Sequence, residues 1–425
     1  FNEYSQNMLL IYLVSLFIAP QLWLEPFIGV RVDLYIYPAW FFVILLNGKI
    51  NNLFRFNIQD IFFFGMIIWI IISMILNDMH VRSGDIIFFY VKIFLLYRIV
   101  SVSLSNNENI KSAINMVVFV VFIVVFEAID HKYYSLDQLG WAGQSLGWVD
   151  PSVLAAGGTG RTRWVAIFDG PGVFCVMFTL ILPFILVGLD DHYKKLTKFL
   201  SLILIALVLL AIWSTGSRGG LLATLAIFGG YLMTRLNISF LTMVKVGILG
   251  ALVFTLAPSH LTQTKDSQNS AQNRVVMWAH GLDMVEDNPL FGVGKGNFKR
   301  YSGALIAHNS FIEIMGEIGF VGVFLWVGIL YFSFKTVYLY IRKETEPIYI
   351  STARGVSLSL IGYLVSSFFV TLEYETLYFL LAIIRSMSAS KNIIIQPTQK
   401  DFLFIIAIVL TMYIIIKVFV STLYF

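Results

Sequence analysis

The chain has 425 residues, of which 58% are hydrophobic and only 13% are charged, and its mean hydropathy is +0.81. Soluble domains usually carry about 25% charged residues, so this composition excludes an ordinary soluble globular protein. The net charge of +4 is modest and is spread among loops, without a basic helix or a basic-aromatic stripe that would indicate nucleic-acid binding. The single cysteine, Cys175, excludes a disulfide within the chain.

Apolar stretches long enough to cross a hydrocarbon core of about 30 Å recur from end to end. Only helices and closed barrels satisfy their backbone hydrogen bonds in lipid, and the runs at 67–75 and 202–210 are continuously apolar rather than alternating as in barrel strands. We therefore predict an all-α integral membrane protein, a single polytopic domain over residues 1–425 with about 12 or 13 transmembrane helices. The predicted spans are 8–24, 33–47, 58–76, 84–102, 113–130, 171–189, 196–213, 219–235, 241–257, 308–335, 353–371, 374–390 and 401–423.

Lys and Arg in short loops predict which side of the membrane is cytoplasmic. The short basic loops fall on one side, so the remaining connections are external, and two of these are long: 131–170 and 258–307. Both long segments are basic, against the topological rule, and an anionic ligand would explain this. The basic residues concerned are Arg161, Arg163, Lys265, Arg274, Lys295, Lys299 and Arg300.

Arg218 stands at the start of a predicted span, directly before two glycines. A cationic side chain is costly beside lipid, and its guanidinium and the free N–H groups of the helix end together form an anion site. The alternative is an interfacial arginine that reaches lipid headgroups. Arg161 and Arg163 lead into another span through residues 164–172, where Gly and Pro fit a turn before the helix, and headgroup contact is again the alternative for Arg163.

Arg274 lies in a loop that is polar enough to need no lipid anchor, so the headgroup alternative is weaker there. Residues 274–285 have the pattern of an amphipathic helix at the membrane interface. We therefore expect Arg274 to contact an anionic ligand.

His308 begins another predicted span, where Asn309 or Ser310 can cap the helix. The histidine is therefore not needed as a cap, and a histidine with its ordinary pKa near 6.5 can accept a proton at neutral pH. A structural histidine is the alternative. Glu313 and Glu317 are spaced i,i+4 and share one face deeper in the helix, where they would tune His308 or pair with an arginine.

Two other motifs carry little weight. Residues 292–296, Gly-Val-Gly-Lys-Gly, are similar to a phosphate loop but lack the four residues between its glycines and the Ser or Thr after its Lys. Residues 190–192, Asp-Asp-His, fit a solvated charged turn beside lysines better than a metal cluster. Since no His, Cys, Asp or Glu set has zinc spacing and no external Asp-x-Asp pair occurs, we expect metal-free chemistry and no cofactor.

Three ordered segments resemble the O-antigen ligase-like superfamily. Residues 214–220, Ser-Thr-Gly-Ser-Arg-Gly-Gly, look like its Ser-Arg-Gly element. The segment from Arg274 to 288–298 looks like its loop element, and 308–322 looks like the start of its His-containing helix. In the N-terminal half, only residues 163–172 match.

This resemblance implies a membrane C-type glycosyltransferase-like fold with a periplasmic loop subdomain, in the bacterial inner membrane with its active site facing the periplasm. It implies metal-independent, inverting transfer of a glycan from an undecaprenyl-diphosphate carrier to an acceptor hydroxyl. By motif position, Arg218 and Arg274 would hold the diphosphate and His308 would activate the acceptor hydroxyl. Further substrate contacts are expected from Arg161, Arg163, Glu313, Glu317, Lys299 and Arg300.

Several branches of this function stay open. An O-antigen ligase, with lipid A-core as acceptor, comes first because the His308 and Arg274 segments follow the ligase-like pattern. A repeat-unit polymerase comes second, since Arg161, separated by ten residues from Gly172, is similar to an arginine motif of polymerases, and a chain-length regulator would then be a candidate partner. A protein O-glycosyltransferase is third. A flippase or transporter for lipid-linked glycans is the alternative of another class, although no internal repeat is evident.

Overall fold

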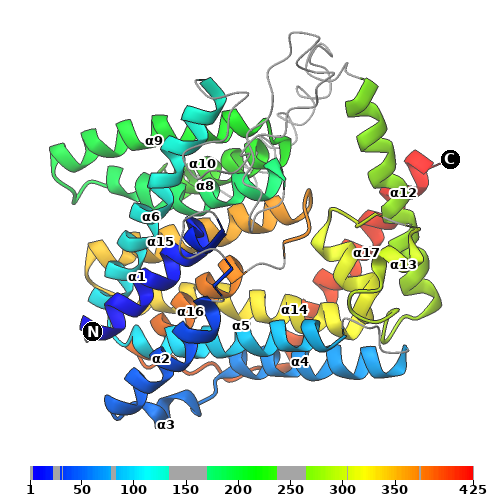
Figure 1. The fold of residues 1–425 in the computed structure, drawn as a ribbon, viewed down its shortest axis with the longest axis horizontal. Helices are drawn as coiled ribbons and strands as arrows, with labels where there is room; N and C mark the ends of the chain where they lie inside the picture. The colour runs from blue at the N-terminus through cyan, green and yellow to red at the C-terminus, as the bar shows by residue number, and fades with distance from the viewer. Residues whose placement is uncertain are drawn as a thin grey trace. The chain divides into compact units, whose positions relative to one another are not determined.

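The computed structural model of the chain describes residues 3–22, 29–30, 32–77, 83–133, 170–236, 265–303, 305–372 and 375–424. Within these ranges every regular element is a helix and there is no strand (Figure 1). The helices are α1 (Glu3–Phe17), η1 (Pro20–Leu22), α2 (Val32–Leu46), α3 (Ile50–Leu53), α4 (Ile58–Leu76), α5 (Ser83–Ser103), α6 (Asn107–Tyr133), α8 (Pro171–Leu186), η2 (Val187–Leu189), α9 (Lys195–Thr215), α10 (Arg218–Leu236), α12 (Lys265–Asp287), α13 (Phe298–Tyr301), α14 (Ser310–Lys343), α15 (Pro347–Ser367), α16 (Glu375–Ser390) and α17 (Gln399–Tyr424).

Each predicted span overlaps a helix, except 241–257, which lies outside the described residues. The agreement is weakest for 8–24, because α1 ends at Phe17. Among the described helices, eight are long and apolar enough to cross a membrane. This number is smaller than the predicted 12 or 13, partly because α1 and α2 have only 15 residues each and α16 has 16. The chain is an all-α integral membrane protein, which confirms the predicted class. The membrane C-type fold stays an expectation from the resemblance.

The chain divides into two compact units. Unit 1 comprises Phe1–Asn57, Lys92–Ile227 and Ser333–Ile395, and unit 2 comprises Ile58–Val91, Phe228–Phe332 and Gln396–Phe425. Helices α5, α10 and α14 contribute residues to both units. This division into units does not decide whether residues 1–425 form the single polytopic domain that we predicted, which stays a prediction.

Helix α8 forms the centre of unit 1 and packs against α6, α9 and α15. Small residues bring the α8 and α15 backbones close together, as is common between membrane helices. A Cβ on Gly355 would lie 2.8 Å from Phe184 Cδ1, and Ser359 Oγ donates to the Leu180 carbonyl over 2.6 Å. Cys175 is completely buried in α8.

Glu344, directly after α14, joins four helix ends of unit 1. Its carboxylate accepts hydrogen bonds from Asn107 Nδ2 (2.7 Å) and Tyr340 Oη (3.1 Å) and pairs with Lys391 Nζ (2.9 Å). The N–H groups of residues 345 and 346 donate to its other oxygen, over 2.9 and 3.2 Å. Burial by itself raises the pKa of Glu344, but these donors outweigh it and lower the pKa to about 2.

In unit 2, α12 and α17 lie side by side (Figure 1). Glu286 of α12 accepts a hydrogen bond from Tyr413 Oη (2.9 Å) and pairs with Lys417 Nζ (2.9 Å), both on α17. The start of α17 is fixed by a capping box, because Asp401 Oδ2 accepts from the N–H and hydroxyl of Thr398, each over 2.8 Å. Unit 2 therefore holds α12 against a membrane helix.

Candidate functional site

Arg218 is the first residue of α10 in unit 1, as predicted. The preceding turn is built by Gly216, which ends α9 with φ 57°, and by Ser217, whose Oγ accepts the N–H of Gly220 over 3.1 Å. A Cβ on Gly220 would meet Cys175 Sγ of α8, so the glycine is needed for close packing. The Arg218 side chain itself is exposed. The geometry therefore presents a permanent cation at a helix N-terminus, a favourable place for an anion.

Helix α14 in unit 2 is broken at Gly319, whose φ of 68° and ψ of −174° are not helical. The loop 289–294 supplies hydrogen bonds at this break. The N–H groups of Val293 and Gly294 donate to the carbonyls of residues 316 and 317 over 3.0 and 2.8 Å. The N–H of Phe320, which in a continuous helix would bond to residue 316, donates instead to the Pro289 carbonyl over 2.8 Å. The loop thus docks into the break, and the break depends on the loop.

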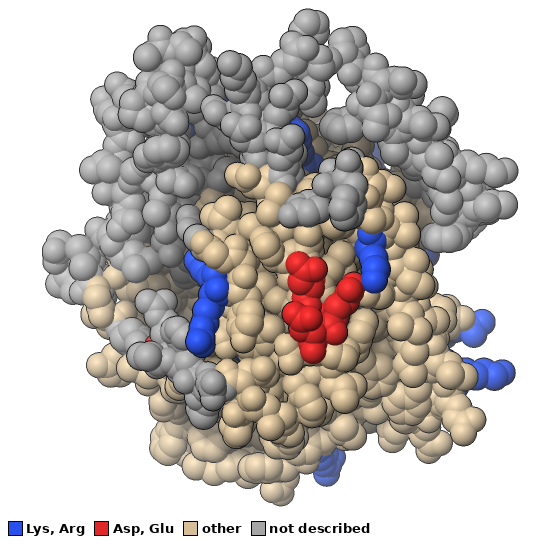
Figure 2. Space-filling view, turned by 90° about the vertical axis from the view of Figure 1, so that its right-hand side faces the viewer, with Lys and Arg blue, Asp and Glu red and all other residues tan. Residues whose placement is uncertain are grey.

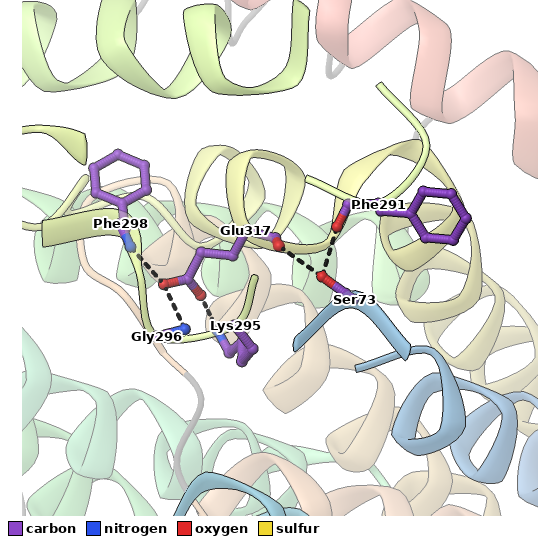
Figure 3. Close-up of polar contacts among 6 residues, drawn as sticks. All are labelled: Ser73, Phe291, Lys295, Gly296, Phe298 and Glu317. Carbon is purple, nitrogen blue, oxygen red and sulfur yellow. Dashed lines mark hydrogen bonds and ion pairs between the residues drawn. The ribbon is translucent and has the colours of Figure 1, made fainter. Parts of the chain in front are cut away.

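Helix α4 supports the same break. Trp69 Nε1 donates to the Ile318 carbonyl over 2.9 Å, and its ring stacks on that of Phe291, with centroids 4.7 Å apart. Ser73 Oγ lies 2.6 Å from the Phe291 carbonyl oxygen and 3.2 Å from that of Glu317 (Figure 3). Non-helical backbone within a membrane helix is tolerated where other protein groups satisfy it, and here α4 and the loop do so.

The Glu317 carboxylate is enclosed by residues 295–298 (Figure 3). Lys295 Nζ lies 2.5 Å from Oε2, while the N–H groups of Gly296 and Phe298 donate to Oε1 over 3.0 and 3.2 Å. Only 7% of the Lys295 side chain and 3% of the Glu317 side chain are exposed. The glycine loop that is similar to a phosphate loop therefore binds a carboxylate from its own chain.

Helix α12 runs alongside the first turns of α14. Trp278 Nε1 donates to the Ala307 carbonyl over 2.9 Å, and a Cβ on Gly281 would meet the side chain of Ile312. Because both sets of partners advance along the chain in the same order, the two segments run in the same direction here. Arg274 is half-buried and stands one turn before Trp278 on the same face of α12. It therefore lies level with the chain that leads into α14.

His308 is half-buried and directly precedes α14, with a left-handed φ of 49°. Of the two predicted caps, Asn309 is the N-cap, because its Oδ1 accepts the N–H groups of Phe311 (3.0 Å) and Ile312 (3.2 Å). The carbonyl just before His308 is the one bound by Trp278. The uncommon backbone conformation of His308 is therefore fixed from both sides, by the Trp278 hydrogen bond before it and by the Asn309 cap after it.

The other candidates in unit 2 differ in exposure. Lys299 and Arg300 are exposed on the single turn of α13, whereas Glu313 is 8% exposed, in the first turn of α14. Glu313 and Glu317 are thus both buried, one turn apart.

Acidic side chains gather on the face of unit 2 that carries α12 and α17, with Lys or Arg on both flanks (Figure 2). The last two turns of α12 contribute exposed carboxylates, namely Asp283, Glu286 and Asp287. These charges and the negative end of the helix dipole disfavour an anion there. The cationic Arg274 lies in the middle of the same helix, away from this end.

The predicted residues thus fall into three groups. Unit 2 contains Arg274, His308 and the exposed Lys299 and Arg300, whereas Arg218 belongs to unit 1. Arg161 and Arg163 lie outside the described residues. Sequence reasoning did not foresee the break at Gly319, the contribution of α4 or the pairing of Lys295 with Glu317. Glycines at 292, 294, 296, 316 and 319 were the available signal, because glycines at such density permit close backbone approach.

Residues 202–327 match the protein family described as O-antigen ligase. The matched segment is less than a third of the chain and contains Arg218, Arg274 and His308. It confirms the predicted resemblance to the O-antigen ligase-like superfamily and supports a glycan-processing role of the ligase or polymerase type. A comparison with curated proteins found no match.

Proposed function

We propose that the protein is a glycosyltransferase that transfers a glycan from an undecaprenyl-diphosphate carrier to an acceptor hydroxyl at the periplasmic face of the bacterial inner membrane. The acceptor hydroxyl is that of lipid A-core, which makes the protein an O-antigen ligase. The observation that carries this proposal is the hydrogen bond from Trp278 to the Ala307 carbonyl, inside the segment that matches the O-antigen ligase family. Trp278 lies one turn after Arg274 on α12, and Ala307 directly precedes His308.

In the proposed reaction, the acceptor oxygen attacks the anomeric carbon opposite the diphosphate and inverts that centre. The bond from the anomeric carbon to the diphosphate oxygen breaks, and the diphosphate keeps the electron pair. His308 takes the proton of the acceptor hydroxyl. Arg274 stabilises the leaving diphosphate through its permanent charge and two-pronged donor geometry.

Arg218 is proposed as a second diphosphate ligand because of its motif and its exposed place at the start of α10. Arg161 and Arg163 are proposed as further substrate contacts because of their motif. Lys299 and Arg300 are proposed to contact anionic groups of the substrates because both side chains are exposed on α13. Glu313 is proposed to contact the acceptor, since it lies one turn below the start of α14.

The test is transfer in vitro with purified protein, a polyprenyl-diphosphate glycan and lipid A-core. His308→Ala should abolish transfer while the donor still binds, and Arg218→Ala and Arg274→Ala should each weaken both donor binding and turnover. His280→Ala, at a half-buried histidine of α12, and Arg235→Ala, at the far end of α10 from Arg218, are the matched controls. Full transfer by His308→Ala would show that the base assignment is wrong.

A repeat-unit polymerase is the second candidate, because the matched family supports either role. The same assay separates the two when lipid A-core is compared with unextended repeat units as acceptor. One capped product supports a ligase, whereas a ladder of products supports a polymerase. Transfer that continues in EDTA is expected for either, since Arg rather than a metal ion would neutralise the diphosphate.

A further inference from the structure

The loop 292–298 has the construction of an anion-binding loop. Gly292, Gly294 and Gly296 all have positive φ, of 65°, 90° and 87°. These conformations turn two N–H groups, of residues 296 and 298, and the Lys295 ammonium toward one point. Successive N–H groups arranged in this way form concave sites for phosphates and other anions. In this protein the anion at that point is the Glu317 carboxylate (Figure 3).

We propose that Glu317 is a positioning residue, which acts as the built-in anion of loop 292–298 and so fixes α13 and the start of α14 for the reaction. This inference rests on the proposed function and deepens it. In this proposal Glu317 makes no direct contact with the substrate, because both of its carboxylate oxygens accept hydrogen bonds from the loop and only 3% of its side chain is exposed.

The connection from Glu317 to the reacting groups is short. Its carboxylate holds the N–H of Phe298, the first residue of α13, which also carries Lys299 and Arg300. The chain then continues through Ser302, whose Oγ donates to the Leu305 carbonyl over 2.6 Å, to His308. At the other end of the loop, α12 carries Arg274. Release of the loop would therefore loosen both sides of the proposed site.

Stability alone does not explain the pair. Two charges buried together lose hydration, so a buried ion pair often adds little net stability compared with apolar residues, whereas removal of one partner leaves a costly unpaired charge. The pair nevertheless selects one loop conformation, because a single carboxylate must accept a lysine and two N–H groups at once. This is the property expected of a positioning element.

The first experiment compares Glu317→Gln and Lys295→Met with the wild type in the transfer assay. The amide oxygen of Gln can still accept the two N–H groups but no longer carries the charge that Lys295 needs. We expect kcat to fall by about 10- to 100-fold, the effect of roughly 1 Å of misplacement. KM for the donor should change far less, because the proposed diphosphate ligands remain. The control is Glu286→Gln, which removes an exposed carboxylate paired with a lysine in the same unit but outside the loop.

The second experiment is chemical rescue, and its main measurement, the unfolding temperature, does not require activity. Glu317→Ala removes a fragment equivalent to acetate and leaves the loop donors unfilled. Acetate should therefore raise the Tm of detergent-solubilised Glu317→Ala and restore part of its kcat, whereas chloride at equal ionic strength should not. Wild type and the double variant Lys295→Met/Glu317→Ala should show no response to acetate.

The two experiments separate this inference from the proposed function. If the wild type transfers glycan and Glu317→Gln keeps full kcat, Glu317 has no positioning role. If acetate fails to raise the Tm of Glu317→Ala, the loop is not an anion site. If the wild type transfers no glycan, the proposed function is wrong, but the Tm response to acetate still tests whether the loop is an anion site.

Discussion

Replacement of Gly319 by alanine should separate loop 289–294 from α14. With φ 68° and ψ −174°, Gly319 has a backbone conformation that is essentially restricted to glycine. A Cβ at this position would also meet the Leu290 carbonyl and lie 2.8 Å from the Phe291 nitrogen. Both obstacles are backbone atoms, so the loop cannot yield by rotating a side chain.

The expected cost follows from these contacts. Strain at such a position costs about 1–3 kcal/mol. Displacement of the loop also breaks the three hydrogen bonds at the break, from the N–H groups of Val293, Gly294 and Phe320, at about 1 kcal/mol each. Together these give a loss of about 4–6 kcal/mol. Gly303→Ala is the matched control, because Gly303 has φ 79° but nothing within 4 Å of its added Cβ. Its expected cost is about 1–2 kcal/mol, from backbone strain alone.

Thermal unfolding of both variants in detergent, followed by circular dichroism, measures the difference. Gly319→Ala should unfold at a clearly lower temperature than Gly303→Ala and should become sensitive to proteolysis within residues 288–303. Equal unfolding temperatures would show that the loop does not depend on the break, and the account of α14 given above would then fail.

Three further predictions use unfolding as the measurement. Asn309→Ala should cost about 1 kcal/mol because two N–H groups lose their cap, whereas Asn309→Ser should retain most of the stability. The lowered pKa of Glu344 means that its carboxylate contributes stability fully above its ordinary pKa of about 4.3 and loses it as the pH falls toward about 2. Glu344→Gln should flatten the stability profile in that window, and an unchanged profile would contradict the assignment. Arg98→Lys should cost about 2–3 kcal/mol, because the buried guanidinium donates to three carbonyls near the end of α3 and a lysine cannot reproduce this geometry. Arg385→Lys is its control and should cost less, because the Arg385 guanidinium donates to the Arg55 carbonyl in an exposed hydrogen bond.

Local features of the fold could be predicted from the sequence. The start of α10 at Arg218, the helix that carries Arg274 and the cap at Asn309 each depend on residues within one or two turns. Their signals are the apolar periodicity and capping chemistry of neighbouring residues, which need no distant partner.

The break at Gly319 and the burial of Glu317 depend on partners far away in the chain. A sequence pattern places Glu313 and Glu317 on one helix face, but only the folded loop shows that Glu317 binds Lys295. Likewise, a glycine within an apolar run is compatible with a continuous membrane helix. Only the folded structure shows that Trp69 donates to the carbonyl of the residue before Gly319. Such features are set by tertiary contacts, which periodicity does not report.

The break in α14 also has a consequence for assembly. Within the described residues, the groups that donate to the carbonyls of residues 316–318 come from α4 and from the loop before α14, and both are synthesised before α14 leaves the ribosome. A helix entering lipid alone satisfies its backbone best when it is continuous. We therefore expect the bend in α14 to form after insertion, when the finished segment meets partners that are already in the membrane, and the end of the helix next to His308 to take shape at that late step.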